Sequence, residues 1–298
     1  MEMTDRTRRT LGLLTAAGAL PYLTLKAIWL AGGTIGVRDA PFLADPSVVV
    51  LNTVTVLLDA ILVALALALT RPFGARLPAW MLLLPIWVGT GFLLPMVVAI
   101  LPVAALGSLS DATGPLEPWV QPLVYGGFAW QGVGLALAFV SYAVRRWGAV
   151  ITRGGTVAAP LRPLLRVLVG GGAAAAGLSG LLHVVAGIAS GSGSAVLVDV
   201  ANALFAAAGA LGVARLAGGA TEHRFASAVA GWVGTGAMFA WGLWSAVLTM
   251  AGTALAHPDP ISGPAALAGL LGGFALAVAG LVALAGAQQP VAAEPARA

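Results

Sequence analysis

Eight long apolar stretches, separated by short polar segments, account for most of this 298-residue chain. Each is longer than 20 residues, and a helix of that length crosses a hydrocarbon core of about 30 Å. None alternates apolar and polar residues as a membrane β-strand does, and helices are the other way to satisfy the backbone in lipid. We therefore predict an all-α, polytopic integral membrane bundle of about eight transmembrane helices. The expected spans are residues 10–33, 48–70, 79–105, 120–144, 167–189, 194–216, 227–253 and 264–287.

The composition excludes most soluble classes of protein. Apolar residues make up 59% of the chain and charged residues only 9%, whereas a soluble domain carries about 25% charged residues. The lipid bilayer is therefore the expected partner. The net charge of +4 is spread over short loops, so we do not expect nucleic-acid binding. The chain has no cysteine, and its three histidines lack the spacing of metal ligands, so we expect no disulfide, metal or cofactor.

Basic residues are distributed unevenly about the expected spans. All but two of the 15 lysines and arginines fall on one side, the exceptions being Lys26 and Arg38. Positively charged loops remain on the cytoplasmic side of a plasma membrane, so the pattern predicts that both termini are cytoplasmic. The residues of the basic side are Arg6, Arg8, Arg9, Arg71, Arg76, Arg145, Arg146, Arg153, Arg162, Arg166, Arg215, Arg224 and Arg297.

The spans divide naturally into two sets of four. The longest polar segment, 145–166, contains arginine, glycine and proline, and we interpret it as a cytoplasmic linker. The expected organisation is a first four-helix half at 1–144 and a second half at 167–287. Residues 288–298 lack an apolar face, so a disordered tail is expected there.

A short repeat relates the two expected halves. The sequence WVGTG occurs at 87–91 in the third span and at 232–236 in the seventh, which are corresponding spans. The run LKAIWLAGGTIG of the first span also aligns loosely with LHVVAGIASGSG of the fifth, which sets Lys26 opposite His183. Chance identity in a biased composition is the alternative. If the chain is duplicated, the halves keep the same orientation and a shared site lies between them.

Ionisable and amide side chains inside the expected spans are the candidate functional residues, because polar groups in lipid are costly. The candidate polar site comprises Lys26, Asn52, Asp59, Gln131, His183, Asp199 and Asn202. Asp59 is expected near the middle of the membrane. Lys26, His183 and Asp199 are expected roughly 7–10 Å inside the outer boundary, at about 1.5 Å per residue. This skew predicts a polar cavity that opens to the exterior and holds a small-molecule ligand.

Lys26 is open to three interpretations. Its side chain can extend to the outer headgroups, form an ion pair with Asp59, or bind an anion or a proton. His183 has two possible interpretations. Its pairing with Asp199 would form either a proton relay or a neutral hydrogen bond between helices. Asp59 and Asp199 could instead act as a carboxylate pair in a membrane enzyme.

Two further features concern prolines and aromatic residues. Pro85, Pro95 and Pro102 lie in the third span, which is therefore expected to be kinked or broken and to line a cavity. Trp241 and Trp244 share one face of the seventh span at a spacing of three residues. With Tyr125, Phe128 and Trp130 of the fourth span they would line a pocket or face lipid, and we expect the latter.

The segment PYLTLKAIWLAGGTIGV at 21–37 resembles uncharacterised multi-pass membrane proteins of high-GC actinomycetes. The resemblance extends to PWVQPLVYGGFAWQGVGLALAF in the fourth span. It implies a multi-pass membrane protein and no particular activity. The leading hypothesis is a small-molecule transporter or ligand-binding permease-like protein. The alternatives are a membrane enzyme acting on a lipid or isoprenoid, and a non-catalytic accessory protein.

Overall fold

The computed structural model describes residues 3–105, 114–152, 154–250 and 260–288. Among them, eight helical segments are long and apolar enough to cross a membrane, which confirms the all-α, polytopic fold of an integral membrane protein. The helices are α1 Asp5–Ala17, α2 Leu20–Leu30, α3 Ala40–Ala44, α4 Pro46–Thr70, η1 Pro72–Arg76, α5 Ala79–Ala105, α6 Val120–Thr152, η2 Ala159–Leu161, α7 Arg162–Ser190, α8 Gly193–Ala217, α9 Arg224–Met250 and α10 Ser262–Ala285. Two short strands, β1 Thr156–Val157 and β2 Ala287–Gln288, pair antiparallel.

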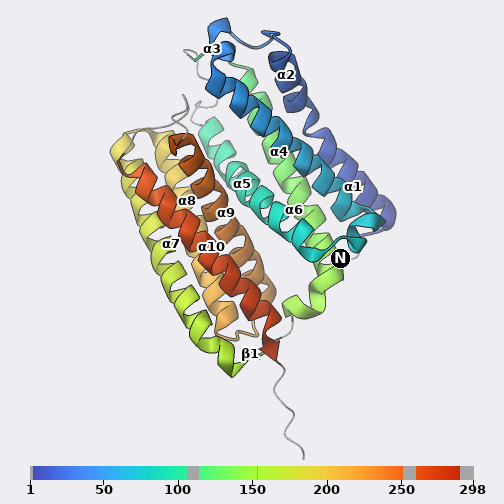
Figure 1. The fold of residues 1–298 in the computed structure, drawn as a ribbon, viewed down its shortest axis with the longest axis vertical. Helices are drawn as coiled ribbons and strands as arrows, with labels where there is room; N and C mark the ends of the chain where they lie inside the picture. Colours follow the sequence, from blue (N-terminus) through green and yellow to red (C-terminus); the bar gives the residue numbers. More distant parts are fainter. Residues whose placement is uncertain (1–2, 106–113, 153, 251–259, 289–298) are drawn as a thin grey trace, which may run out of the picture.

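Helices α7 to α10 form a closed four-helix bundle, which we call the second group (Figure 1). Its core contains Leu165, Val213 and Leu276. Glycines allow the helices to approach closely, since a Cβ on Gly234 would lie 2.3 Å from the backbone nitrogen of Gly209. Small residues therefore take the place of bulky apolar contacts, as is usual between helices in lipid.

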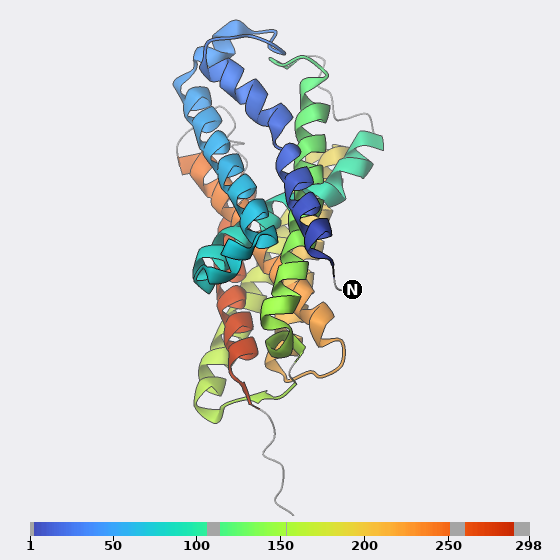
Figure 2. The ribbon, with the colours of Figure 1, turned by 90° about the vertical axis from the view of Figure 1, so that its right-hand side faces the viewer.

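The remaining helices, α1 to α6, form a first group that packs less extensively (Figures 1 and 2). Leu69, Ile86 and Leu135 lie in its core. Helix α5 packs against α6 of its own group on one side and against α9 of the second group on the other. It is the main connection between the two groups.

The first span is interrupted between α1 and α2, at Gly18 and Ala19. Pro21 follows the break, and a proline has no N–H to continue the helical hydrogen bonds. Trp130 of α6 donates its Nε1–H to the carbonyl of Leu14 at 2.8 Å, next to this interruption.

Helix α5, in contrast, is continuous from Ala79 to Ala105 through all three of its prolines. The third span is therefore not broken, which was one of the two forms expected of it. Each proline removes one backbone hydrogen bond from α5. Packing of α6 and α9 against α5 stabilises the helix at these positions.

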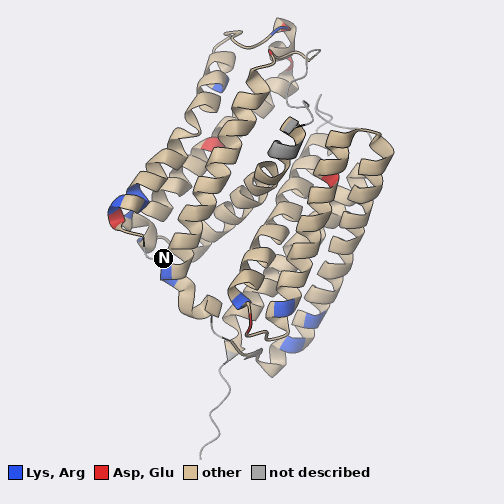
Figure 3. Cartoon of the chain, turned by 180° about the vertical axis from the view of Figure 1, so that it is seen from behind, with Lys and Arg blue, Asp and Glu red and all other residues tan. Residues whose placement is uncertain are grey.

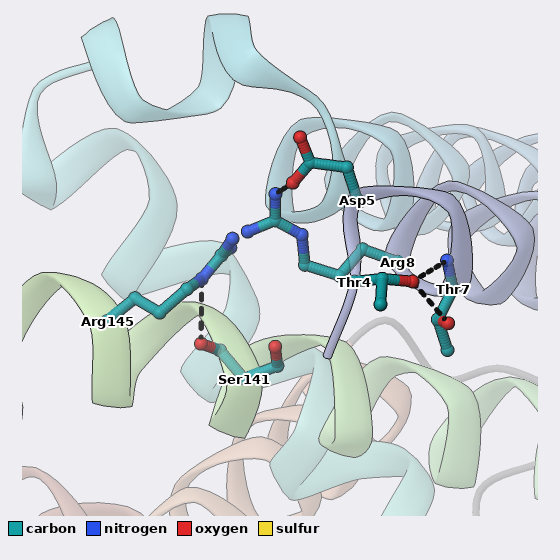
Figure 4. Close-up of polar contacts among 6 residues, drawn as sticks. All are labelled: Thr4, Asp5, Thr7, Arg8, Ser141 and Arg145. Atoms are coloured by element: carbon teal, nitrogen blue, oxygen red, sulfur yellow. Dashed lines mark hydrogen bonds and ion pairs between the residues drawn. The ribbon is translucent and has the colours of Figure 1, made fainter. Parts of the chain in front are cut away.

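Helix α6 extends further than its apolar pattern suggested, to Thr152 rather than residue 144. Arg145 donates to the carbonyl of Ser141 at 3.1 Å (Figure 4). Arg146 donates to the Tyr142 hydroxyl and to the Leu77 carbonyl. Arg145 thus binds a carbonyl one turn earlier on its own helix, and Arg146 connects α6 to the segment that precedes α5. The connection to α7 is consequently shorter than the expected linker at 145–166.

The connection between the groups also contacts the C-terminal end of α10. Val157 of β1 lies opposite Ala287 of β2, and Thr156 opposite Gln288. Of the tail expected to be disordered, residues 289–298 lie outside the described part of the chain.

The charged residues in the described part of the chain lie relative to the helices as the sequence pattern predicted, and Arg153 and Arg297 of the basic side lie outside that part. Arginines gather at the beginnings of α1, α7 and α9 and at the ends of α4, α6 and α8 (Figure 3). We call the side of the molecule on which these helix termini lie the arginine-rich end. Lys26 and Arg38 lie toward the other end, the arginine-poor end. One of the basic contacts is drawn in Figure 4, where Arg8 pairs with Asp5 and points toward Arg145.

Candidate functional site

A cavity of about 990 Å³ lies between the two groups, toward the arginine-poor end. Its wall is made by α2 and α3, by the later parts of α5, α7 and α9, and by the earlier parts of α4, α6, α8 and α10. Because successive spans run in opposite directions, these parts meet at the same end of the molecule. The volume is at the upper limit of ordinary small-molecule pockets, roughly 300–1,000 Å³.

Lys26 of α2 projects into this cavity. Its ammonium donates a hydrogen bond to Oδ1 of Asn52 on α4 and lies 5.0 Å from the ring centre of Tyr22 and 5.1 Å from that of Trp29. Both rings offer an electron-rich face to a cation. The direct ion pair of Lys26 with Asp59 is not formed among the described residues, although the two charges interact over a longer distance.

Asp59 lies further along α4, outside the cavity wall, and is only 2% exposed. Its neighbour is Gln131 of α6, which is also 2% exposed. Oδ2 of Asp59 and Nε2 of Gln131 are nevertheless left without a hydrogen bond of ordinary geometry. The structure therefore does not bring Asp59 to Asp199, and the carboxylate pair suggested for an enzyme is not formed.

His183 of α7 pairs with Asp199 of α8, as the sequence suggested. The distance from Nδ1 to Oδ1 is 2.7 Å, and both residues line the cavity. Gly187, one turn beyond His183, makes room for the pair, because a Cβ there would lie 3.0 Å from Cβ of Asp199. With Nδ1 occupied by the carboxylate, Nε2 is the nitrogen that remains for a second partner.

The two polar pairs occupy matching places in the two groups. Lys26 and Asn52 join the first and second spans of the first group, and His183 and Asp199 join the first and second spans of the second. All four line the same cavity. Asn202, one turn after Asp199, lines it as well, so five of the seven candidate residues are brought together and Asp59 and Gln131 are set apart.

Aromatic side chains form much of the apolar wall. Phe92 of α5 stacks on Trp241 of α9, with ring centres 4.6 Å apart and planes at 5°, and meets Trp244 edge-on at 5.7 Å. Trp241 and Trp244 line the cavity, as do Tyr125 and Phe128, so the expectation that they face lipid was wrong.

Trp130, in contrast, is 55% exposed and lies outside the wall. Sequence reasoning missed Phe92, although it directly follows the first WVGTG.

The two WVGTG segments pack against each other where α5 meets α9, a contact that we call the seam. Trp87 donates to Oγ1 of Thr235 at 3.1 Å, and Trp232 donates to Oγ1 of Thr90 at 3.0 Å. The exchange is reciprocal: each tryptophan binds the threonine of the other copy. Such an arrangement is what a two-fold axis parallel to the two helices would produce.

Glycine brings the helices of the seam together. A Cβ on Gly91 would lie 2.2 Å from the carbonyl carbon of Gly236, so no side chain fits there. The cavity lining begins one residue beyond the seam on each helix, at Phe92 and Ala237. On α5 and α9 the seam therefore lies between the cavity lining and the arginine-rich end.

Comparison of the chain with known protein families, curated proteins and solved structures finds no match. The functional argument consequently rests on the cavity, its polar pairs and the seam.

Proposed function

We propose that this protein is a carrier that takes up a small molecule from the outside of the plasma membrane into the cavity between its two helix groups. In this proposal the arginine-rich end and both termini are cytoplasmic, following the distribution of positive charge. The observation that carries the proposal is the cavity of about 990 Å³, into which each group contributes one polar pair.

The seam serves as the closed inner gate of this carrier. Its two threonines, Thr90 and Thr235, are each 1% exposed, and of its two tryptophan–threonine hydrogen bonds one is buried and the other partly buried. Rocking of one helix group against the other about such a contact would expose the cavity alternately to the two sides. The reciprocal contact and the matching pairs support an origin by internal duplication.

A membrane enzyme for lipids or isoprenoids has less support. Such an enzyme needs an available acid in the wall of its apolar pocket. Asp59 lies outside the wall, and Oδ1 of Asp199 is engaged by His183.

The carrier proposal is tested by cysteine labelling, for which the chain is suited because it has no cysteine of its own. Thr90→Cys places a thiol of similar size in the seam. If the seam opens inward, a membrane-impermeant maleimide will react with this thiol from the cytoplasmic side, at least about tenfold more slowly than with Thr152→Cys at the exposed end of α6.

Leu276→Cys, in the core of the second group, is the control for general unfolding and should remain unlabelled. A seam thiol that stays as unreactive as the one at Leu276 would show that the seam does not open, and the carrier proposal would fail.

A further inference from the structure

We propose that the cavity binds an amphipathic monoanion, with its acidic group at the ammonium of Lys26 and its hydrocarbon part along Phe92, Trp241 and Trp244. The inference rests on the proposed function in that it names the class of molecule that the carrier takes up. It is carried by the contacts of Lys26, by the positions of the acidic residues and by the aromatic wall.

The ammonium of Lys26 has unused binding capacity. An ammonium has three N–H donors, and the one hydrogen bond found for it goes to Asn52. The rings of Tyr22 and Trp29 stabilise the charge from the side, but no carboxylate of the described residues lies within salt-bridge distance. A cation in an apolar wall is costly unless a counter-charge approaches it, so an anionic ligand is favoured here.

Neither acidic residue near the cavity takes this role. Asp59 is almost fully buried and lies outside the wall, so its charge acts on Lys26 only over a longer distance. Asp199 lines the cavity, but its Oδ1 is bound by His183. A ligand that enters therefore meets free donors at Lys26 on the wall of the first group, while the carboxylate of Asp199 on the wall of the second group is already paired with His183.

The rest of the wall favours a ligand with a hydrocarbon part. The rings of Phe92 and Trp241 are stacked, and the ring of Trp244 contacts Phe92 edge-on. Met96 and Leu248 continue the apolar surface. A small hydrophilic anion would leave this surface in contact with water, whereas an acyl chain would cover it.

The test compares three probes with the same twelve-carbon chain on the protein in phosphatidylcholine nanodiscs. They are dodecanoate, dodecyltrimethylammonium and zwitterionic dodecylphosphocholine, at a pH where the carboxylate is ionised. Dodecanoate should raise the thermal midpoint by about 3 °C or more in a saturable manner, and the other two probes should not. Equal or greater stabilisation by the cation would overturn the inference.

Two substitutions locate the binding. Lys26→Met should weaken dodecanoate binding at least about tenfold, while Lys26→Arg should retain it. If Lys26→Met does not fold, Asn52→Asp provides the same information, because it keeps the shape of the site and places a competing carboxylate against the ammonium. Undiminished dodecanoate binding by a folded Asn52→Asp protein would contradict the inference.

A third arm identifies the source of the anion. If phosphatidylglycerol added to the nanodiscs competes with dodecanoate in the parent protein, the acidic group is supplied by a membrane lipid. If it does not, a free amphipathic acid is the ligand. The outcome is independent of seam labelling: dodecanoate binding with an unreactive Thr90→Cys thiol leaves the inference standing and removes the carrier proposal.

Discussion

Charged side chains inside the membrane are explained individually by their neighbours. Lys26 is held by an amide oxygen and two aromatic rings, and His183 by a carboxylate. The rarity of polar residues in the spans was sufficient to select all of these groups from the sequence. The partner of Lys26 was not predictable, because Asp59 and Asn52 lie two turns apart on one helix and only packing decides which of them faces Lys26.

The pairing of His183 with Asp199 can be measured by a double-mutant cycle. Alanine substitutions at the two positions, singly and together, should give a coupling free energy of unfolding of about 1 kcal/mol, the usual scale for hydrogen bonds between membrane helices. Leu204→Val, on the lipid-exposed face of α8, is the control and should change stability little. Additive effects of the two alanines would mean that the pair contributes no coupling.

At the level of elements, length and apolar composition were sufficient to predict the eight spans, but not how each helix turns its faces. Trp241 and Trp244 were expected to face lipid, because the sequence of α9 alone does not show which of its faces points to a cavity and which to the bilayer. The side they face is set by α5, which brings Phe92 against them. The end of α6 was also missed, because Arg145 and Arg146 interrupt the apolar stretch while the helix itself continues to Thr152.

The close approach of α5 and α9 predicts that Gly91→Ala destabilises the protein. The added methyl would meet backbone atoms of Gly236, which cannot turn aside as a side chain can. A loss of about 1–3 kcal/mol in the free energy of unfolding is expected, as for other overpacked sites. Gly177→Ala is the matched control, because a Cβ there meets nothing within 4 Å. Its effect should be neutral or slightly stabilising, and the same result for Gly91→Ala would contradict the geometry of the seam.

For the whole molecule, the repeated WVGTG was the one sequence signal of how the two groups meet. It suggested corresponding spans, and in the structure the copies contact each other directly. The only sequence signal of the cavity was that the polar residues within the spans lie mostly toward the arginine-poor side. Its walls required the spatial arrangement, because they combine residues from nine helices that are distributed along the described chain.

The central claim is that water-soluble molecules reach the cavity from the outside, and labelling of Ser245→Cys tests it most directly. Ser245 lines the cavity from α9, whereas Leu243, two residues earlier, is 40% exposed on the same helix and lies outside the wall. In right-side-out vesicles, an impermeant maleimide should label Ser245→Cys and leave Leu243→Cys unmodified. Labelling of Ser245→Cys only in inverted vesicles, or equal labelling of the two positions, would contradict the account.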